Sequence, residues 1–498
     1  MPEEAVRAWQ AAGAQVGWMG RDREHLLLTF AKDPIGLVEP ILAFRLERPG
    51  QLGQLPEAGM AFGLDFSFTQ VTDASLRELA ELKSLQALSL IAAEMTDAGL
   101  KELAGVKGLL SLSLGGPQVT DASLKKLAGL KHLQSLDLRG SPVTDTGLKE
   151  LARLTGLQAL NLMSTPVTDA GLKELAGLKG LQTLSLGFTL VTDAGLTELA
   201  ELNGLRTLSL GFTQVTDAGL KELAGLRGLQ SLNLANTQVT DAGLKELVGL
   251  NLKELKIPEP ARTDVGLKHI LTVIASATDL DLEGWKVTDA ALKGLAGLTS
   301  LQSLSLIATE VTDTGLRELT GLKGLQTLYL KSTRVTDTGL EDLAALTGLQ
   351  TLDLTQTRVT DTGLKELAGL KGLQSLYLGD TQVTDAGLKE LSGLTGLQTL
   401  HLYRTRVTDT GLRELAGLKG LQTLYLNFTQ VTDEGLREVA GLKGLQSLNL
   451  VGTQVTDAGL RELAGLKGLR SLNLFNTRVT DAGLEELKKH LRDCSILY

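Results

Sequence analysis

The chain has 498 residues, a formal net charge of -9 and a single cysteine. This modest acidic balance argues against a general nucleic-acid binder, which normally carries a strong basic excess. A single cysteine excludes an intramolecular disulfide framework. The first residues do not combine a basic segment with an apolar stretch, and no run of about 18 apolar residues occurs anywhere. We therefore expect a cytoplasmic protein with no secretory signal and no membrane contact.

Residues 1–60 contain the first predicted elements. The segment PEEAVRAWQAAGA is typical of a short amphipathic helix that ends at Gly13, and HLLLTF and ILAFRL are typical of strands. Because the end of a repeat array exposes its core, we expect this segment to be an N-terminal cap. The alternative is a small domain that binds a ligand of its own.

A repeating unit, marked by the dipeptide Thr-Asp, begins near residue 61. The marks recur at a constant period, except that the step into Asp264 is one residue shorter and the step out of it is one residue longer. They number eighteen and end in Asp73, Asp97, Asp121, Asp145, Asp169, Asp193, Asp217, Asp241, Asp264, Asp289, Asp313, Asp337, Asp361, Asp385, Asp409, Asp433, Asp457 and Asp481.

Each unit follows the consensus LQxLxLxxTxVTDxGLxELAGLxG, whose positions we number from the first leucine, so that Leu229 is position 1. Apolar positions 4 and 6 flank a polar position 5, which is the alternation of a strand with one buried face. The leucines of DAGLKELVGL (241–250) recur every third residue and share one side of a short helix. Thr240 and Asp241 stand where a helix N-cap belongs. One strand and one short helix cannot bury their leucines alone, so the units must stack.

This pattern resembles the leucine-rich repeat family. The VTDxGL helix start is similar to bacterial leucine-rich repeat proteins and to the leucine-rich halves of F-box proteins. The resemblance covers about residues 61–498 and implies an α/β solenoid of about 18 repeats, with a parallel sheet on the concave face and short helices on the convex face. Position 9, usually Asn in the family, is Thr in thirteen units. Since a hydroxyl has one donor and an amide has two, we expect a thinner loop hydrogen-bond ladder. Position 15 is Gly in fifteen units, which indicates close packing of the helix start against the strand layer.

Residues 250–290 break the pattern within the expected solenoid of residues 61–483. Pro258 and Pro260 lie in one loop, Trp285 stands at a Thr position and Ala277 replaces a leucine. This segment is interpreted as a junction between two amplified arrays. The alternative is a bend or a docking feature. In either case we expect the sheet to continue through it. Residues 484–498, a charged helix followed by an apolar half-strand, are expected to form the C-terminal cap.

Motifs that carry chemistry are not found in the sequence. The histidines His25, His132, His269, His401 and His490 lack metal-ligand spacing, and P-loop, GxGxxG and GxSxG motifs do not occur. One aspartate per repeat leaves a calcium ion short of ligands, so helix capping is favoured over metal binding. Cys494 is interpreted as a buried filler rather than a nucleophile. We therefore expect no enzyme, cofactor or metal site.

The variable positions 3, 5 and 7, with 8 and 10 in the loop beyond, indicate where a partner binds. From the eleventh unit onward these positions hold six basic residues against three acidic ones, which favours an acidic or mixed protein surface as the ligand. Exposed Tyr and Arg are enriched at binding surfaces. The predicted partner site consists of Tyr329, Asp353, Tyr377, His401, Tyr403, Arg404 and Tyr425.

Two interpretations of this row remain open. The tyrosines at position 5 recur in every second repeat, which duplication of a two-repeat block also explains. The expected function is that of a monomeric, non-catalytic scaffold that binds a protein partner and no nucleic acid. The alternative is a substrate adaptor or effector linked to ubiquitin-type machinery.

Overall fold

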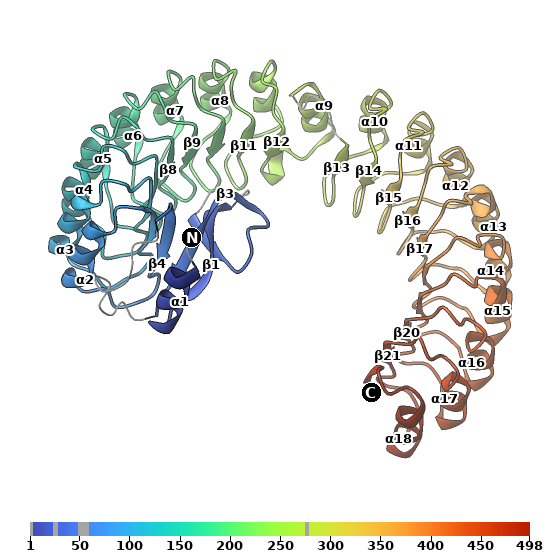
Figure 1. Cartoon of the computed structure of the whole chain (residues 1–498). Helices are drawn as coiled ribbons and strands as arrows, with labels where there is room; N and C mark the ends of the chain where they lie inside the picture. The colour runs from blue at the N-terminus through green and yellow to red at the C-terminus, as the bar shows by residue number, and fades with distance from the viewer. Residues whose placement is uncertain (1–2, 23–27, 48–58, 274–277) are drawn as a thin grey trace. The chain divides into compact units, whose positions relative to one another are not determined.

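The structure is a computed structural model that describes residues 3–22, 28–47, 59–273 and 278–498 (Figure 1). Two units are distinguished: unit 1 comprises residues 1–261 and 269–275, and unit 2 comprises residues 262–268 and 276–498. In each unit every repeat contributes a short strand, a loop and a short helix, as the leucine spacing predicts. His25 and Ala277 lie outside the described residues.

The strands of unit 1 form a sheet in the order β12-β11-β10-β9-β8-β7-β6-β5-β4-β3-β1-β2. Strands β3 to β12 pair in parallel, whereas β1 is antiparallel to both β2 and β3. Their bounds are β1 (Gln15–Asp22), β2 (Leu28–Ala31), β3 (Leu37–Arg45), β4 (Phe62–Asp65), β5 (Leu85–Ser89), β6 (Ser111–Ser113), β7 (Ser135–Asp137), β8 (Ala159–Asn161), β9 (Thr183–Ser185), β10 (Thr207–Ser209), β11 (Ser231–Asn233) and β12 (Glu254–Lys256).

Unit 2 holds a second parallel sheet, in which β13 to β22 pair in chain order. Each strand pairs in the register of one repeat, so that equal positions of neighbouring repeats lie side by side. Their bounds are β13 (Asp279–Asp281), β14 (Ser303–Ser305), β15 (Thr327–Tyr329), β16 (Thr351–Asp353), β17 (Ser375–Tyr377), β18 (Thr399–His401), β19 (Thr423–Tyr425), β20 (Ser447–Asn449), β21 (Ser471–Asn473) and β22 (Ser495–Leu497).

Helices lie on the side of each repeat layer opposite to its strand (Figure 1). The α-helices are α1 (Glu3–Ala11), α2 (Asp73–Glu78), α3 (Asp97–Glu102), α4 (Asp121–Leu127), α5 (Asp145–Leu151), α6 (Asp169–Leu175), α7 (Asp193–Leu199), α8 (Asp217–Leu223), α9 (Asp264–Val273), α10 (Asp289–Leu292), α11 (Asp313–Arg317), α12 (Asp337–Leu343), α13 (Asp361–Leu364), α14 (Asp385–Leu391), α15 (Asp409–Glu414), α16 (Asp433–Val439), α17 (Asp457–Leu463) and α18 (Asp481–His490). The 3-10 helices are η2 (Leu79–Glu81), η3 (Leu103–Gly105), η4 (Gly243–Leu247), η5 (Glu259–Ala261), η6 (Lys293–Leu295), η7 (Lys365–Gly369) and η8 (Leu415–Gly417).

Within each unit the described strands pair into one sheet, and the expectation of a sheet that continues through residues 250–290 stays a prediction. Pro258 and Pro260 have no N–H to donate, and the chain there folds into η5, with the Ala261 amide donating to the Pro258 carbonyl at 3.1 Å.

The core consists of the leucine and valine positions of every repeat. In the repeat that begins at Leu229, the side chains at positions 1, 4, 6, 11, 16, 19 and 22 are all buried, namely Leu229, Leu232, Leu234, Val239, Leu244, Leu247 and Leu250. Because each layer covers the next, the hydrophobic contribution accumulates from repeat to repeat rather than in one central core.

In most repeats the aspartate of the Thr-Asp pair binds the next repeat rather than its own helix. Asp217 Oδ1 accepts from the Thr240 amide at 2.7 Å, and Oδ2 accepts from the Thr240 hydroxyl at 2.7 Å. The threonine alone caps the helix, since Thr216 Oγ1 accepts from the Ala218 amide at 3.3 Å. The expectation that the aspartate also caps its own helix was therefore incomplete: the carboxylates form a ladder that links successive repeats.

This ladder also accounts for the small residue at position 15. A Cβ added to Gly219 would meet Asp193 Oδ1 of the preceding repeat, closer than van der Waals contact. Where position 15 is Ser123, its hydroxyl donates to Asp97 Oδ1 at 2.6 Å and so joins the ladder. The limit on side-chain size at position 15 therefore comes from the carboxylate of the neighbouring repeat. The sequence analysis had instead attributed it to close packing against the strand layer.

The threonine at position 9 closes the loop within its own repeat. Thr237 Oγ1 donates to the Leu234 carbonyl at 2.8 Å, and the same bond recurs at Thr333 with 2.6 Å. The threonine hydroxyl has one proton, and it is used within the same repeat. This agrees with the expectation of fewer side-chain hydrogen bonds between neighbouring loops. The preceding position 8 has a positive φ in most repeats, including 57° at Phe188 and 53° at Arg404.

The N-terminal segment packs against the first repeat. Trp9 of α1 is fully buried, stacks on Phe44 at 4.7 Å and meets Phe62 edge-on at 5.7 Å between ring centroids. Strand β3 continues the repeat sheet through its parallel pairing with β4. At the other end, β22 pairs in parallel with β21, and Cys494 is only half-buried rather than fully buried as expected.

Candidate functional site

Strands β15 to β19 bring five of the predicted partner-site residues into one row. Their register pairs Tyr329 with Asp353, Asp353 with Tyr377, Tyr377 with His401, and His401 with Tyr425. All five occupy position 5, which alternates with buried leucines at positions 4 and 6 and therefore lies on the outer face of the sheet. Adjacent members are about 4.8 Å apart, the spacing of neighbouring strands.

The aromatic members of this row stack on one another. His401 lies parallel to Tyr425 with ring centroids 4.1 Å apart, and Tyr377 meets His401 edge-on at 4.6 Å. The rings of Tyr377, His401 and Tyr425 are half-buried rather than fully exposed to solvent. The cause is the strand spacing, which places each ring in van der Waals contact with the next.

Burial also changes the titration of this cluster. It lowers the pKa of the His401 imidazole to about 4, so the ring is neutral at pH 7. Burial likewise raises the pKa of the Tyr377 hydroxyl, which keeps that group protonated. Tyr377, His401 and Tyr425 therefore form an uncharged aromatic surface with polar tips.

Asp353 is the charged member of the row. Its Oδ1 accepts from the Thr355 amide at 2.8 Å. Within the residues that the structure describes, no lysine or arginine nitrogen comes within 4.0 Å of its carboxylate. A half-buried carboxylate without a cation thus separates Tyr329 from the aromatic stack.

Tyr403 and Arg404 follow the row at positions 7 and 8. The Tyr403 ring covers Gly379 of the preceding repeat so closely that an added Cβ would overlap it. The Arg404 guanidinium lies over the Phe428 ring, 5.4 Å from its centroid. The structure therefore extends the row by a second aromatic contact and by a cation held on an aromatic face.

One arginine of the basic surplus in this half has an acidic partner within the protein. Arg334 Nη2 lies 3.2 Å from Glu310 Oε2, so this arginine is paired within the protein. Exposed pairs of this kind contribute little to stability. Because Arg334 and Glu310 are both in the count of six basic against three acidic residues, their pairing leaves the net surplus unchanged.

Sequence reasoning missed an exposed aromatic pair in unit 1. Phe188 and Phe212 stack with centroids 4.0 Å apart, and they are 52% and 48% exposed. The signal was present in the sequence, since GFT occurs at the same place in two successive repeats. Leu190, also half-exposed, extends this apolar patch.

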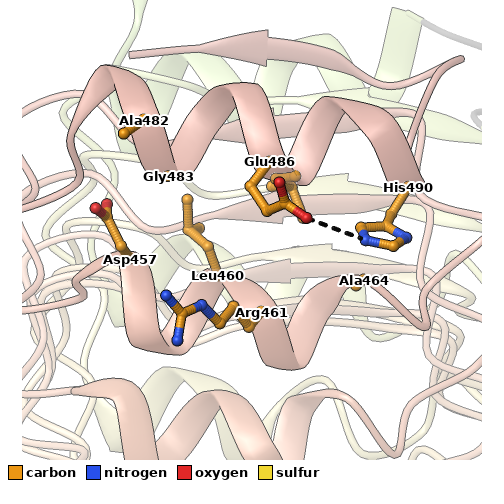
Figure 2. A pocket seen from close by; sticks show the side chains of 9 residues that line it. Asp457, Leu460, Arg461, Ala464, Ala482, Gly483, Glu486 and His490 are labelled. Atoms are coloured by element: carbon orange, nitrogen blue, oxygen red, sulfur yellow. Dashed lines mark ion pairs between the residues drawn. The ribbon is translucent and has the colours of Figure 1, made fainter.

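A groove runs between α17 and α18, on the helix side of unit 2 (Figure 2). Glu486 faces His490 at 3.8 Å, and Leu460 and Leu487 contribute apolar walls. Its carboxylates are already engaged: Asp457 accepts two hydrogen bonds from Thr480, which lower its pKa, and Glu486 pairs with Lys489 at 2.6 Å. The groove is thus a gap between helices whose acidic groups have protein partners.

Metal, nucleophile and membrane features were sought in the described part of the chain. There, no group of three or more His, Cys, Asp or Glu side chains could hold a metal ion. Burial raises the pKa of the Cys494 thiol, which disfavours the reactive thiolate. None of the described helices has the length and apolar character needed to cross a bilayer.

Known proteins provide an independent comparison. The family profile described as "Leucine Rich repeat" matches residues 129–152, 154–176, 203–224, 227–248, 346–368, 373–392, 421–440, 445–464 and 469–488. No curated protein sequence matches the chain. The matched repeats and the stacked strand-and-helix units show that the chain folds as a leucine-rich repeat solenoid within each unit.

Solved structures with similar folds come from diverse sources. An internalin from Listeria monocytogenes is 24% identical, with 75% of this chain and 88% of that chain covered and a TM-score of 0.36. A leucine-rich repeat protein of Leptospira interrogans is 22% identical, with coverage of 86% and 100% and a TM-score of 0.42. The TLR13–ssRNA13 complex is 17% identical, with coverage of 88% and 70% and a TM-score of 0.52. At these identities the likeness concerns the fold alone.

Proposed function

We propose that this protein is a non-catalytic scaffold that binds a protein partner on the strand face of unit 2. Leucine-rich repeat proteins are typically interaction scaffolds or receptors, which is consistent with this function. The observation that carries the proposal is the row Tyr329, Asp353, Tyr377, His401 and Tyr425, held in register on five neighbouring strands.

The chemistry of the row suits protein recognition. Tyrosine offers a large, amphipathic surface with few rotatable bonds, so little conformational entropy is lost on binding. Mutual stacking restricts the rings before a partner arrives, which lowers that cost further. Tyr403 and Arg404 add an aromatic surface and a cation beside the row.

Affinity capture from the native host with the immobilised full chain tests this proposal. Tyr377→Ala combined with Tyr425→Ala should weaken binding of the captured protein about 30-fold, as expected for hot-spot residues worth about 2 kcal/mol. The matched control is Ser185→Ala with Ser209→Ala, which changes the same position on β9 and β10 of unit 1. Equal affinity of both double variants for the partner would identify the tyrosines as duplication relics.

The remaining expectations belong to the same proposal. We propose that residues 1–60 and 484–498 cap the array, because Trp9 covers Phe44 and Phe62 at one end and β22 covers β21 at the other. We also propose a monomer in the bacterial cytoplasm, which light scattering and cell fractionation would test. A link to ubiquitin-type machinery stays an alternative, and recovery of a ligase subunit in the capture experiment would favour it.

A further inference from the structure

Four repeats carry an aspartate at position 5, and their surroundings differ. In all four, Oδ1 accepts from the amide two residues later, at 2.8 to 3.1 Å; the four are Asp65, Asp137, Asp281 and Asp353. The second carboxylate oxygen is therefore the one that distinguishes them. Its partners show what each site binds.

Both aspartates of unit 1 are neutralised by an arginine of the same chain. Asp65 Oδ2 lies 2.6 Å from Arg45 Nη2 and 2.7 Å from Nε, and its side chain is 3% exposed. Asp137 Oδ2 lies 3.4 Å from Arg139 Nε. A carboxylate partly withdrawn from water is costly unless it is paired, and in these repeats the pair is built in.

The Asp65 site also supplies an aromatic face. The Arg45 guanidinium lies over the Phe30 ring, 4.4 Å from its centroid. One arginine is thus held by a carboxylate through its nitrogens and by an aromatic ring through its face. Guanidinium groups suit both contacts because they are planar, delocalised and weakly hydrated.

Asp353 has the carboxylate and the aromatic rings of that arrangement but no cation. Tyr329 and Tyr377 occupy the same position on the two neighbouring strands, which are spaced about 4.8 Å from β16, so these two residues flank Asp353. Among the described residues, Lys331 and Arg358 approach it no closer than the 4.0 Å limit of an ion pair. Asp281, the fourth aspartate, is exposed and has Ser305 as its neighbour on β14, so it lacks flanking tyrosines.

We propose that Asp353, flanked by Tyr329 and Tyr377, binds an arginine side chain of the protein partner. The guanidinium would donate to Asp353 Oδ2 and lie against a tyrosine ring, as Arg45 does with Asp65 and Phe30. This inference rests on the proposed function and specifies its chemistry. The charge count had favoured a partner with an acidic or mixed surface. The present inference places one basic group, an arginine, on that surface.

A titration without the partner tests the site directly. The full chain, carrying 13C-labelled tyrosine rings, is titrated with N-acetyl-arginine amide to concentrations on the order of 10 mM or more, because a single side chain binds weakly. We expect saturable shifts of the Tyr329 and Tyr377 signals and no shift at Tyr403. Capped citrulline, which has the same shape without the charge, should leave all signals in place.

Two variants make the result specific. Asp353→Asn keeps the acceptor for the Thr355 amide, since Asn233 Oδ1 accepts from the Ala235 amide at 2.9 Å at the same position, and it should abolish the response to capped arginine. Asp281→Asn should leave the response unchanged. A response that survives in Asp353→Asn, no response to arginine, or an equal response to capped citrulline or capped lysine would overturn the proposal.

The captured partner provides the second test. Asp353→Asn should weaken its binding at least about tenfold, with Asp281→Asn as the control, because an arginine left without its carboxylate is penalised in the complex. A partner that binds Asp353→Asn with full affinity but loses affinity in the Tyr377 and Tyr425 double variant would overturn the arginine contact while supporting the scaffold. Loss in neither variant would refute both.

Discussion

The strand faces of the two units differ, although their helix sides are built alike. On β9 to β11 of unit 1, position 5 holds Ser185, Ser209 and Asn233, whereas on β15 to β19 of unit 2 it holds three tyrosines, a histidine and an aspartate. The carboxylate ladder hardly changes: Asp169 accepts from Thr192 at 2.8 and 2.6 Å, and Asp337 accepts from Thr360 at 2.7 and 2.6 Å. Contacts that maintain the fold and residues available for binding are therefore separated within each repeat.

The two ends of the chain should differ most in how much stability a substitution removes. Trp9→Ala removes a fully buried ring that stacks on Phe44, and we expect a loss of about 3–5 kcal/mol for the N-terminal segment. Tyr498→Ala, at the other end, removes a side chain that is 61% exposed and should cost little. Urea denaturation followed by tryptophan and tyrosine fluorescence compares them. Similar midpoints for both variants would show that the Trp9 contact is dispensable.

The ladder should contribute equally in both units. Asp217→Ala and Asp337→Ala each remove two hydrogen bonds to a charged acceptor, so we expect about 3 kcal/mol of local destabilisation rather than the roughly 1 kcal/mol of a lost helix cap. Hydrogen exchange of the flanking helices measures the effect. The exposed Asp481, with no described acceptor role toward a following threonine, provides the control variant Asp481→Ala, which should exchange like the parent. Unequal effects at Asp217 and Asp337 would mean that the ladder is not uniform.

Gly379→Ala should perturb unit 2 by a smaller amount. The added methyl group would overlap the Tyr403 ring, which we expect to move outward at a cost of about 1 kcal/mol. Gly369→Ala is the matched control, because an added Cβ there meets no atom within 4 Å. The Tyr403 ring signals in an NMR spectrum report the displacement. If they are the same in both variants, Tyr403 does not rest on Gly379 in solution.

Close to pH 6.5, the pH dependence of stability should show the smallest effect. The pKa of His401 is about 4 in the folded protein and about 6.5 in an unfolded chain. Between these values the unfolded chain binds more protons, so stability falls as the pH drops from 6.5 toward 4 and this group has no influence above 6.5. His401→Gln should flatten that part of the melting-temperature profile, whereas His132→Gln, at an exposed site, should not. An imidazole that titrates near 6.5 by NMR would contradict the buried stack.

Much of the fold and of the candidate row could be predicted from the sequence. Leucine spacing gives the strand and helix of each repeat, and a constant register puts position 5 of neighbouring repeats side by side, which located Tyr329 to Tyr425 correctly. Other features depend on contacts that no local pattern encodes. The carboxylate of Asp217 could cap its own helix or bind Thr240, and both fit the sequence equally well.

Two further features were hidden for different reasons. The positive φ at position 8 falls on Phe188, Gln356 and Arg404, residue types that do not favour the left-handed region, so the loop imposes it. Arg45 lies before the first repeat and Asp65 lies within it. The pair therefore could not be found by comparing equal positions of the repeats. Its counterpart at Asp353 became visible only by comparison of the two sites.

The constant register of the ladder has a consequence for how such a surface can change. Since the regular repeats meet their neighbours through the same contacts, removal of one full repeat length, such as 338–361, would join Asp337 directly to the helix start that begins at Thr362. The core and ladder would close again, but Tyr329 would now lie beside Tyr377, with Asp353 gone. Unequal recombination between near-identical segments could therefore insert or erase a binding position in one step while leaving the buried leucines untouched.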